Sequence, residues 1–279
     1  MIKLVTDSTA YLPEERVREL DIRVVPLCVH FGQEICHEGI DITGEEFYAR
    51  LKSEPELPTT SQPSAGEFLE VFKELHEAGH EIVCLTISSK ISGTWNSALA
   101  AKDMLPEADI SVVDSLYTTV ALQLMVEAAA ETIGAGATRE EVVKQVEEIR
   151  GKMLLLFVVD TLEFLAKGGR IGNARALLGT VLKVKPILVL QEGAIEPLEQ
   201  VRTKKKAVAR MEALVQEHLG DNASEARLGI THALVPEEAE ALKKEMMQLL
   251  GCQEPLIHEL GPVIGTHTGP GLLGIAAYA

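Results

Sequence analysis

Two loops of the sequence combine hydroxyl side chains with the predicted start of a helix. Residues 59–64 read Thr-Thr-Ser-Gln-Pro-Ser, and residues 88–94 read Ser-Ser-Lys-Ile-Ser-Gly-Thr. The first turn of a helix has unpaired N–H groups and a partial positive charge, so an anion such as a carboxylate binds there readily. Gly93 would let a ligand approach the backbone closely. The alternative is that Ser64 only caps its helix and the other hydroxyls face water.

A third segment, residues 261–271, concentrates four glycines, two prolines and two threonines around His267. Such a segment predicts a rigid loop that exposes backbone N–H groups and one titratable ring. A ligand contact and a purely structural histidine remain equally open here. Gly168, Gly169 and Arg170 form either an anion site or a tight turn between helices.

Known catalytic and metal-binding signatures do not occur. Neither hydroxyl loop has the spacing of a phosphate-binding P-loop, and there is no GxSxG nucleophile elbow. The four cysteines form no CxxC pair, so no metal site is expected. A hydrolase or phosphotransferase that uses Ser92, His267 and Asp7 is still an open alternative.

The elements that would position these residues begin with alternating strands and helices. Apolar runs at residues 2–5, 81–87 and 110–113 are separated by helical patterns, which predicts a right-handed parallel α/β sheet covered by helices. Ligands of such sheets gather beyond the carboxyl ends of the strands. The loop at 88–94 follows a predicted strand, as do Asp7 and the pair Asp114 and Ser115. We therefore expect these polar residues to share one edge.

The pattern changes after the apolar run 153–159. Two strands around Gly193 form a predicted hairpin, and further strands near 226–231 and 272–278 alternate with helices. This order predicts a C-terminal α+β domain with a mixed or antiparallel sheet. We place the N-terminal α/β domain at residues 1–160 and the C-terminal domain at 161–279.

Composition and charge exclude several classes of partner. The 279 residues carry a formal charge of −16, which disfavours nucleic acid. The apolar runs are much shorter than the roughly 20 residues that cross a bilayer, and no signal peptide is visible, so we expect a cytoplasmic protein without membrane insertion. Residues 167–210 are basic, because they contain ten Lys and Arg, Lys183 among them, and three Glu. They form either a docking surface for an acidic partner or a solvated helix face.

Taken together, these motifs resemble the DegV family over nearly the whole chain. Each motif is weak alone, but their joint order and spacing are specific. The motifs are Val5-Thr-Asp-Ser-Thr9, Val25-Pro-Leu27, Thr60-Ser-Gln-Pro-Ser64, Ser88-Ser with Ile91-Ser-Gly-Thr94, Asp114-Ser115, Gly168-Gly-Arg-Ile171, Val184-Lys-Pro-Ile187 and Gly261 to Gly271.

The resemblance implies a carrier with no catalytic activity and no cofactor. It would hold one long-chain fatty acid, such as palmitate, stearate or oleate, in an apolar tunnel between domains. Some members are the binding subunit of the bacterial fatty acid kinase, whose separate ATP-dependent subunit forms acyl phosphate for phospholipid synthesis. By motif, Thr60 and Ser92 would bind the carboxylate, with Ser61 adjacent and His267 in the supporting network. We further expect a monomer. The remaining residues that the resemblance implies are Gly93, Thr94 and Thr266 as the supporting loop, and Arg170 and Arg202 as the docking site for the kinase.

Overall fold

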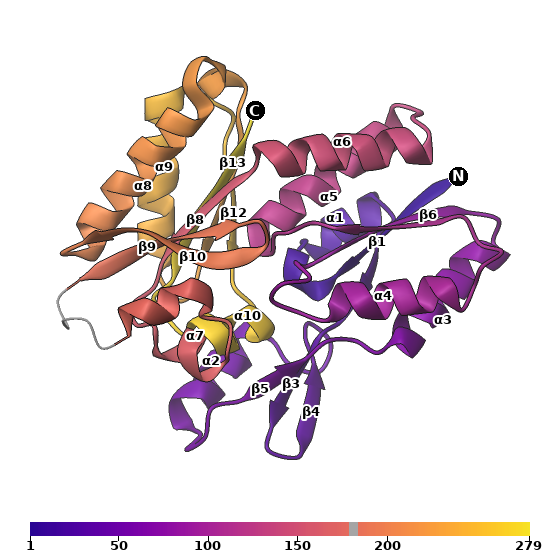
Figure 1. Cartoon of the computed structure of the whole chain (residues 1–279), viewed down its shortest axis with the longest axis horizontal. Coiled ribbons are helices and arrows are strands. Elements are labelled where there is room, and N and C mark those ends of the chain that lie inside the picture. The colour runs from indigo at the N-terminus through magenta and orange to yellow at the C-terminus, as the bar shows by residue number, and fades with distance from the viewer. Residues whose placement is uncertain (179–183) are drawn as a thin grey trace.

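The N-terminal part of the chain forms the predicted parallel sheet (Figure 1). The computed structural model describes residues 1–178 and 184–279. Four strands lie in the order β2-β1-β6-β7, and all neighbours are parallel. Their bounds are β1 (Ile2–Asp7), β2 (Arg23–Val25), β6 (Glu81–Thr86) and β7 (Ile110–Asp114).

Helices cover both faces of this sheet. On one face Phe68 and Phe72 of α3 form a buried core with Ala98 and Ala101 of α4, and on the other face α5 and α6 pack against β6. Glu67, three residues after Ser64, predicts a capping box for α3, and the structure confirms it, because the Ser64 hydroxyl accepts from the third backbone N–H of the helix. The helices are α1 (Glu14–Glu19), α3 (Ala65–Glu77), α4 (Thr94–Asp103), α5 (Thr119–Gly134) and α6 (Arg139–Lys152).

A small antiparallel sheet, with order β4-β3-β5, follows β2. It consists of β3 (Cys28–Phe31), β4 (Glu34–His37) and β5 (Thr59–Ser61), with α2 (Gly44–Ser53) between β4 and β5. The polar turn at residues 32–34 predicts this hairpin, and the pairing of β3 with β4 confirms it. The three prolines of residues 53–63 predict a loop, which is wrong for residues 59–61 because they form β5. Thr60 pairs with Val29, so β5 forms through a distant partner strand and not through a local apolar pattern.

The C-terminal part forms a six-stranded sheet in the order β10-β9-β8-β13-β11-β12. Only β11 and β12 are parallel neighbours, so the predicted mixed sheet is confirmed. The strands and the two helices on the outer face are β8 (Leu154–Val158), β9 (Lys185–Gln191), β10 (Ala194–Val201), β11 (Arg227–His232), β12 (Leu256–Glu259), β13 (Leu273–Tyr278), α8 (Lys204–Leu219) and α9 (Pro236–Leu250).

The change from one large sheet to the other comes before residue 160. We placed the run 153–159 in the N-terminal domain, but β8 pairs with β9 and β13 of the C-terminal sheet. The apolar run alone could not reveal this, because a strand that is buried on both faces has the same pattern in either sheet. The division into two domains at residue 160 stays a prediction.

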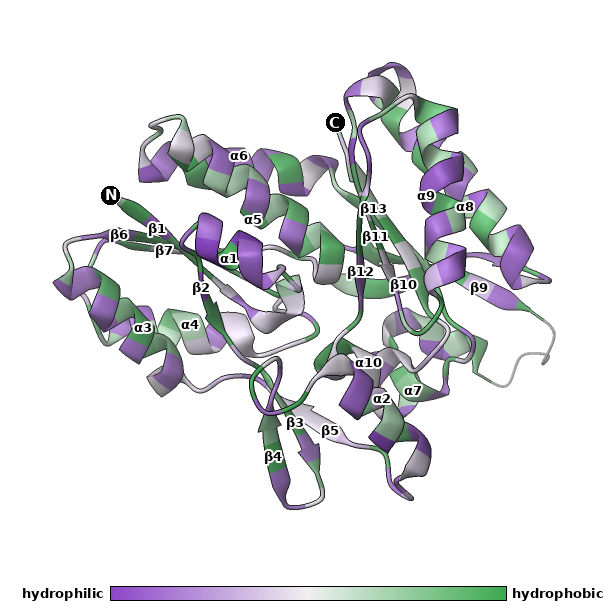
Figure 2. Ribbon diagram, turned by 180° about the vertical axis from the view of Figure 1, so that it is seen from behind, coloured by the Kyte–Doolittle hydropathy of each residue, from purple (hydrophilic) through white to green (hydrophobic). Residues whose placement is uncertain are grey.

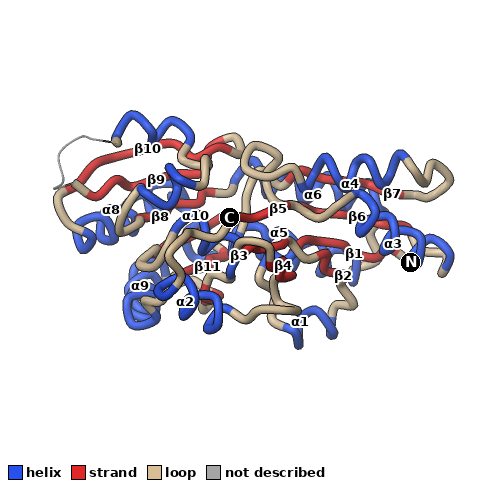
Figure 3. Tube along the Cα trace, turned by 90° about the horizontal axis from the view of Figure 1, so that it is seen from below, coloured by secondary structure: helices blue, strands red, loops and turns tan. Residues whose placement is uncertain are grey.

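The central strands of the six-stranded sheet are buried on both faces. Helix α5 lies between the two large sheets (Figures 1 and 3). Along β8, Leu155 and Phe157 point to the inner core that contains α5, whereas Leu156 and Val158 point to the outer core with α8. Figure 2 shows strands that are mostly hydrophobic and peripheral helices that also carry hydrophilic residues. Both large sheets therefore share one hydrophobic core around α5.

Close contact between α5 and β11 depends on one glycine. A Cβ atom at Gly229 would lie 1.9 Å from Val120 Cγ2. We expect Gly229→Ala to lower the free energy of unfolding by about 1–3 kcal/mol, because the added methyl group overpacks this contact. Chemical denaturation measures the loss, and the double variant Gly229→Ala, Val120→Ala should recover part of it. Equal stability of Gly229→Ala and the parent would contradict the contact.

The glycine-rich segment 261–271 is not the loop that we predicted. It contains the short helix α10 (Pro262–Thr268), which begins with a proline and ends where Gly269 adopts a φ of 68°. The helix packs against α7 (Glu163–Lys167), α2 and β5. Short 3₁₀ turns occur at Ser8–Ala10, Gly172–Leu177 and Gly220–Glu225. Within the described residues, no helix is both long and apolar enough to cross a membrane.

Candidate functional site

A cavity lies where the two large sheets, β5 and α10 meet. The atom-free space between its walls is about 760 Å³, and this volume includes open solvent at the mouth. The inner face of the six-stranded sheet contributes Leu155, Phe157 and Leu190 to the wall. Most of the wall surface is apolar, which suits an apolar ligand. The other apolar lining residues are Leu27, Ile87, Ile91, Leu165, Ile195, Leu260, Val263, Ile264 and Leu272.

The cavity has a polar end at β5 and α10. Thr60 Oγ1 and His267 Nε2 share a hydrogen bond of 2.7 Å, although the residues are 207 positions apart. Both line the cavity together with Ser92 and Arg170. The structure thus brings Thr60, Ser92 and His267 to one cavity.

The imidazole of His267 is neutral at physiological pH. Burial, followed by the charge of Arg170, lowers its pKa to about 4. Its Nδ1 has no hydrogen-bond partner among the described residues and faces Gly168, where a Cβ atom would lie 2.1 Å from it. When the neutral ring carries its hydrogen on Nε2, it donates to Thr60 Oγ1 and leaves the threonine hydroxyl free to donate to a ligand, without adding a positive charge.

The loop of Ser92 lies against the loop that follows β5. Ser92 Oγ and Thr94 Oγ1 are 2.8 Å apart and share a hydrogen bond, and Thr94 is buried at the first position of α4. A Cβ atom at Gly93 would lie 2.9 Å from the side-chain nitrogen Nε2 of Gln62, so glycine permits this close approach. The two hydroxyl loops of the sequence therefore meet in the structure.

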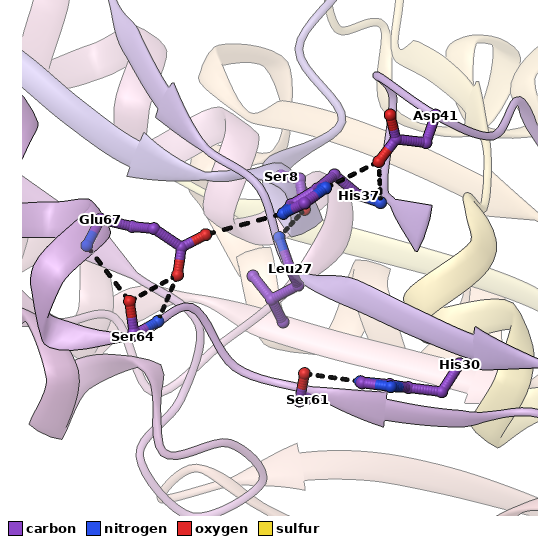
Figure 4. Close-up of polar contacts among 8 residues, drawn as sticks. All are labelled: Ser8, Leu27, His30, His37, Asp41, Ser61, Ser64 and Glu67. Atoms are coloured by element: carbon purple, nitrogen blue, oxygen red, sulfur yellow. Dashed lines mark hydrogen bonds and ion pairs between the residues drawn. The ribbon is translucent and has the colours of Figure 1, made fainter. Parts of the chain in front are cut away.

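Ser61 and Thr266 already have other partners. Ser61 lines the cavity, but its hydroxyl lies 2.8 Å from His30 Nε2 across the small sheet (Figure 4). Figure 4 also shows Ser64 bound to Glu67, which is the capping interaction considered above. Thr266 donates to the Pro262 carbonyl of its own helix. Among these hydroxyls, Thr60 and Ser92 remain the better placed for a ligand.

Arg170 belongs to the polar end itself. Its guanidinium donates to the Ile91 carbonyl at 3.2 Å and to the Gly168 carbonyl at 2.8 Å, so it joins the Ser92 loop to the turn beside His267. A second, open pocket adjoins the polar end of the cavity. It shares Thr60, Arg170 and His267 with the cavity. Arg202, the other expected docking residue, is exposed at the end of β10. Lys183 of the basic stretch lies outside the described residues.

Glu38, which the sequence analysis missed, anchors the start of α10. This buried carboxylate accepts hydrogen bonds from the hydroxyls of Ser8 at 2.5 Å and Tyr11 at 3.1 Å, and from the backbone N–H of Val263 at 2.8 Å. Burial raises its pKa to about 7. A glutamate beside Gly39 at the end of a strand resembles any surface glutamate, so no local pattern could have identified it.

Asp7 does not form a catalytic set with Ser92 and His267. It is buried, burial raises its pKa to about 6, and it accepts from both the N–H and the hydroxyl of Thr9 and from the N–H of Ile87. His267 is bonded to Thr60 instead. No group of three His, Cys, Asp or Glu side chains within residues 1–178 and 184–279 is arranged to hold a metal ion.

The fold and the cavity define a class of two-sheet α/β proteins that enclose an apolar cavity with one polar end. The DegV family model matches residues 1–279. Protein DegV of Bacillus subtilis is 39% identical over 278 residues, which cover 98% of each chain. The chain belongs to the DegV family.

Solved structures of the family have the same fold. A DegV family protein from Thermus thermophilus, described as binding fatty acid, is 37% identical with a TM-score of 0.95 and covers 100% of this chain and 99% of its own. A stearic-acid-binding protein from Eubacterium ventriosum is 29% identical with a TM-score of 0.91 and covers 100% of this chain and 98% of its own.

Proposed function

We propose that this protein binds one long-chain fatty acid in the cavity, with the carboxylate at Thr60, Ser92 and His267. The observation that carries the proposal is the cavity itself, whose aliphatic wall ends at the hydrogen-bonded pair of Thr60 and His267. The fatty-acid binding described for the relatives from Thermus thermophilus and Eubacterium ventriosum supports the same ligand class. Palmitate, stearate and oleate are the expected ligands.

Tail and head group have different roles in this binding. Burial of about fifteen methylene groups at roughly 0.8 kcal/mol each gives on the order of 12 kcal/mol before ordering costs. A charge-assisted hydrogen bond adds only about 1.5–3 kcal/mol. The tail therefore sets most of the affinity, and the hydroxyls of Thr60 and Ser92 set the position of the carboxylate.

The bound carboxylate is presented to a separate ATP-dependent kinase subunit. The open pocket on the outer side of Thr60 and His267 supports this role, because a phosphate donor could approach the head group from there. A carboxylate oxygen would attack the γ-phosphorus of ATP, ADP would leave, and the acyl phosphate would enter phospholipid synthesis. Arg170 and Arg202 are the proposed docking residues of this cytoplasmic, monomeric carrier, which has no catalytic activity of its own.

We expect protein purified from a bacterial host to carry about one fatty acid per chain, because an apolar cavity is costly to fill with water. Native mass spectrometry would show the added mass, and organic extraction followed by chromatography would identify the acid. Delipidated protein should regain the ligand when a single acid is added. Gently purified protein that contains no fatty acid and takes up none would contradict the proposed function.

A further inference from the structure

Three buried hydroxyls on the cavity wall have no hydrogen-bond partner among the described residues. They belong to Thr118, Thr119 and Thr231, whose side chains line the same cavity as Thr60. The three residues are only 7%, 4% and 2% exposed. Buried hydroxyl groups in native proteins almost always have a partner, so these three require an explanation.

The hydroxyls lie where the start of α5 meets the inner face of the six-stranded sheet. Val120 of α5 contacts Gly229 of β11, and Thr231 lies two residues further along the same face. Thr118 is the N-cap residue of α5, yet its side chain does not cap the helix. The first backbone N–H groups of a helix need external partners, so this place offers donors as well as hydroxyls.

A neutral oxygen fits this place better than a second carboxylate. Among the described residues of the lining, the charged or titratable side chains are Arg170 and His267, and both belong to the Thr60 end. A carboxylate at the threonines would be buried without a cation, which is unfavourable. A hydroxyl group avoids that cost, and it can both donate to a threonine oxygen and accept from a threonine or a backbone N–H.

We infer that Thr118, Thr119 and Thr231 form a second polar site in the cavity, which binds a hydroxyl oxygen carried on the acyl chain of the ligand. This inference rests on the proposed function, because it places the acyl chain along the cavity wall. The protein then distinguishes hydroxylated long-chain acids by the position of the hydroxyl group.

The test compares stearate with a positional series of hydroxystearic acids, each competing with a fluorescent fatty acid for the parent protein and for Thr231→Val. Valine has the shape of threonine without the hydroxyl. For one isomer, we expect its affinity relative to stearate to fall about threefold to tenfold in Thr231→Val. The affinity for the isomer is divided by the affinity for stearate in each protein. A change of this ratio between the parent and Thr231→Val separates the hydroxyl interaction from general effects on the cavity.

The matched control is Thr6→Val, because Thr6 is a fully buried threonine of β1 with an equally unpartnered hydroxyl outside the cavity lining. It should leave every ratio unchanged, and Thr118→Val and Thr119→Val should act like Thr231→Val on the same isomer. If Thr231→Val changes no ratio while stearate still binds, the second site is wrong and the proposed function stands. If the parent binds neither stearate nor any isomer, the proposed function fails.

Discussion

Replacing Thr60 with valine and Ser92 with alanine together should weaken fatty-acid binding about tenfold or more, because the buried carboxylate loses two hydroxyl donors. The fold should persist, because the two changes remove only the hydrogen bonds of Thr60 with His267 and of Ser92 with Thr94 and leave the hydrophobic core unchanged. Acyl-phosphate formation with a kinase subunit should fall further than binding does. Phosphoryl transfer needs the reacting atoms within about 3–3.5 Å, so a small displacement of the head group affects the reaction more than the affinity.

The double variant Thr59→Val, Ser89→Ala is a suitable control. It makes the same two chemical changes on the same strand and the same loop, but neither residue lines the cavity. Because Thr59 lines the second pocket, this variant is the control for fatty-acid binding, and Ser89→Ala alone is the control for acyl-phosphate formation. Titration calorimetry would measure binding to both delipidated proteins, and circular dichroism would verify their folds. A Thr60 and Ser92 variant that bound and reacted like the control would show that the head group lies elsewhere.

Replacing Glu38 with glutamine should change the way stability depends on pH. Burial raises the pKa of Glu38 from 4.5 to about 7, so the folded protein retains a proton that the unfolded chain has lost. The stabilisation by this group is complete below pH 4.5 and is lost as the pH rises through about 7. Glutamine stays neutral. As the pH increases from 4.5 to about 7, the free energy of unfolding of Glu38→Gln minus that of the parent should therefore increase by about 3 kcal/mol.

Two buried histidines also make the stability depend on pH, so Glu38→Gln must be compared with the parent at each pH. Burial lowers the pKa of His267 to about 4 and that of His258 to about 3, so these rings destabilise the fold as the pH falls through the same range. Urea unfolding of both proteins at each pH cancels their contribution. Glu77→Gln removes the same charge from an exposed position and should show no such rise. A pH-independent difference for Glu38→Gln would mean that Glu38 is ionised in the folded protein.

The sequence predicted most elements because their signals are local. The capping box at Ser64 and the hairpin around Gly193 both lie where they were expected. β5 and α10 were missed because both depend on distant partners. Thr60 needs Val29 as a strand neighbour, and the first turn of α10 needs the carboxylate of Glu38.

The candidate site was predictable in its residues but not in its arrangement. Hydroxyl loops at helix starts indicated an anion site, and the structure brings Thr60, Ser92 and His267 to one cavity. The position of Arg170 inside the polar end could not be predicted, because a basic residue near two glycines fits a surface turn equally well. The unpartnered hydroxyl of Thr231 could not be predicted either, since a threonine in a strand gives no sign of what it faces.

The position of β13 has a consequence for the synthesis of the protein. This strand lies between β8 and β11 but comes after both of them in the sequence. A growing chain on the ribosome therefore holds two partial sheets, and β8 and β11 each have an unpaired edge until β13 is made. Such edges pair readily with strands of other chains. The nascent protein is thus vulnerable to aggregation until β13 emerges, and a chaperone that covers these edges would protect it during that time.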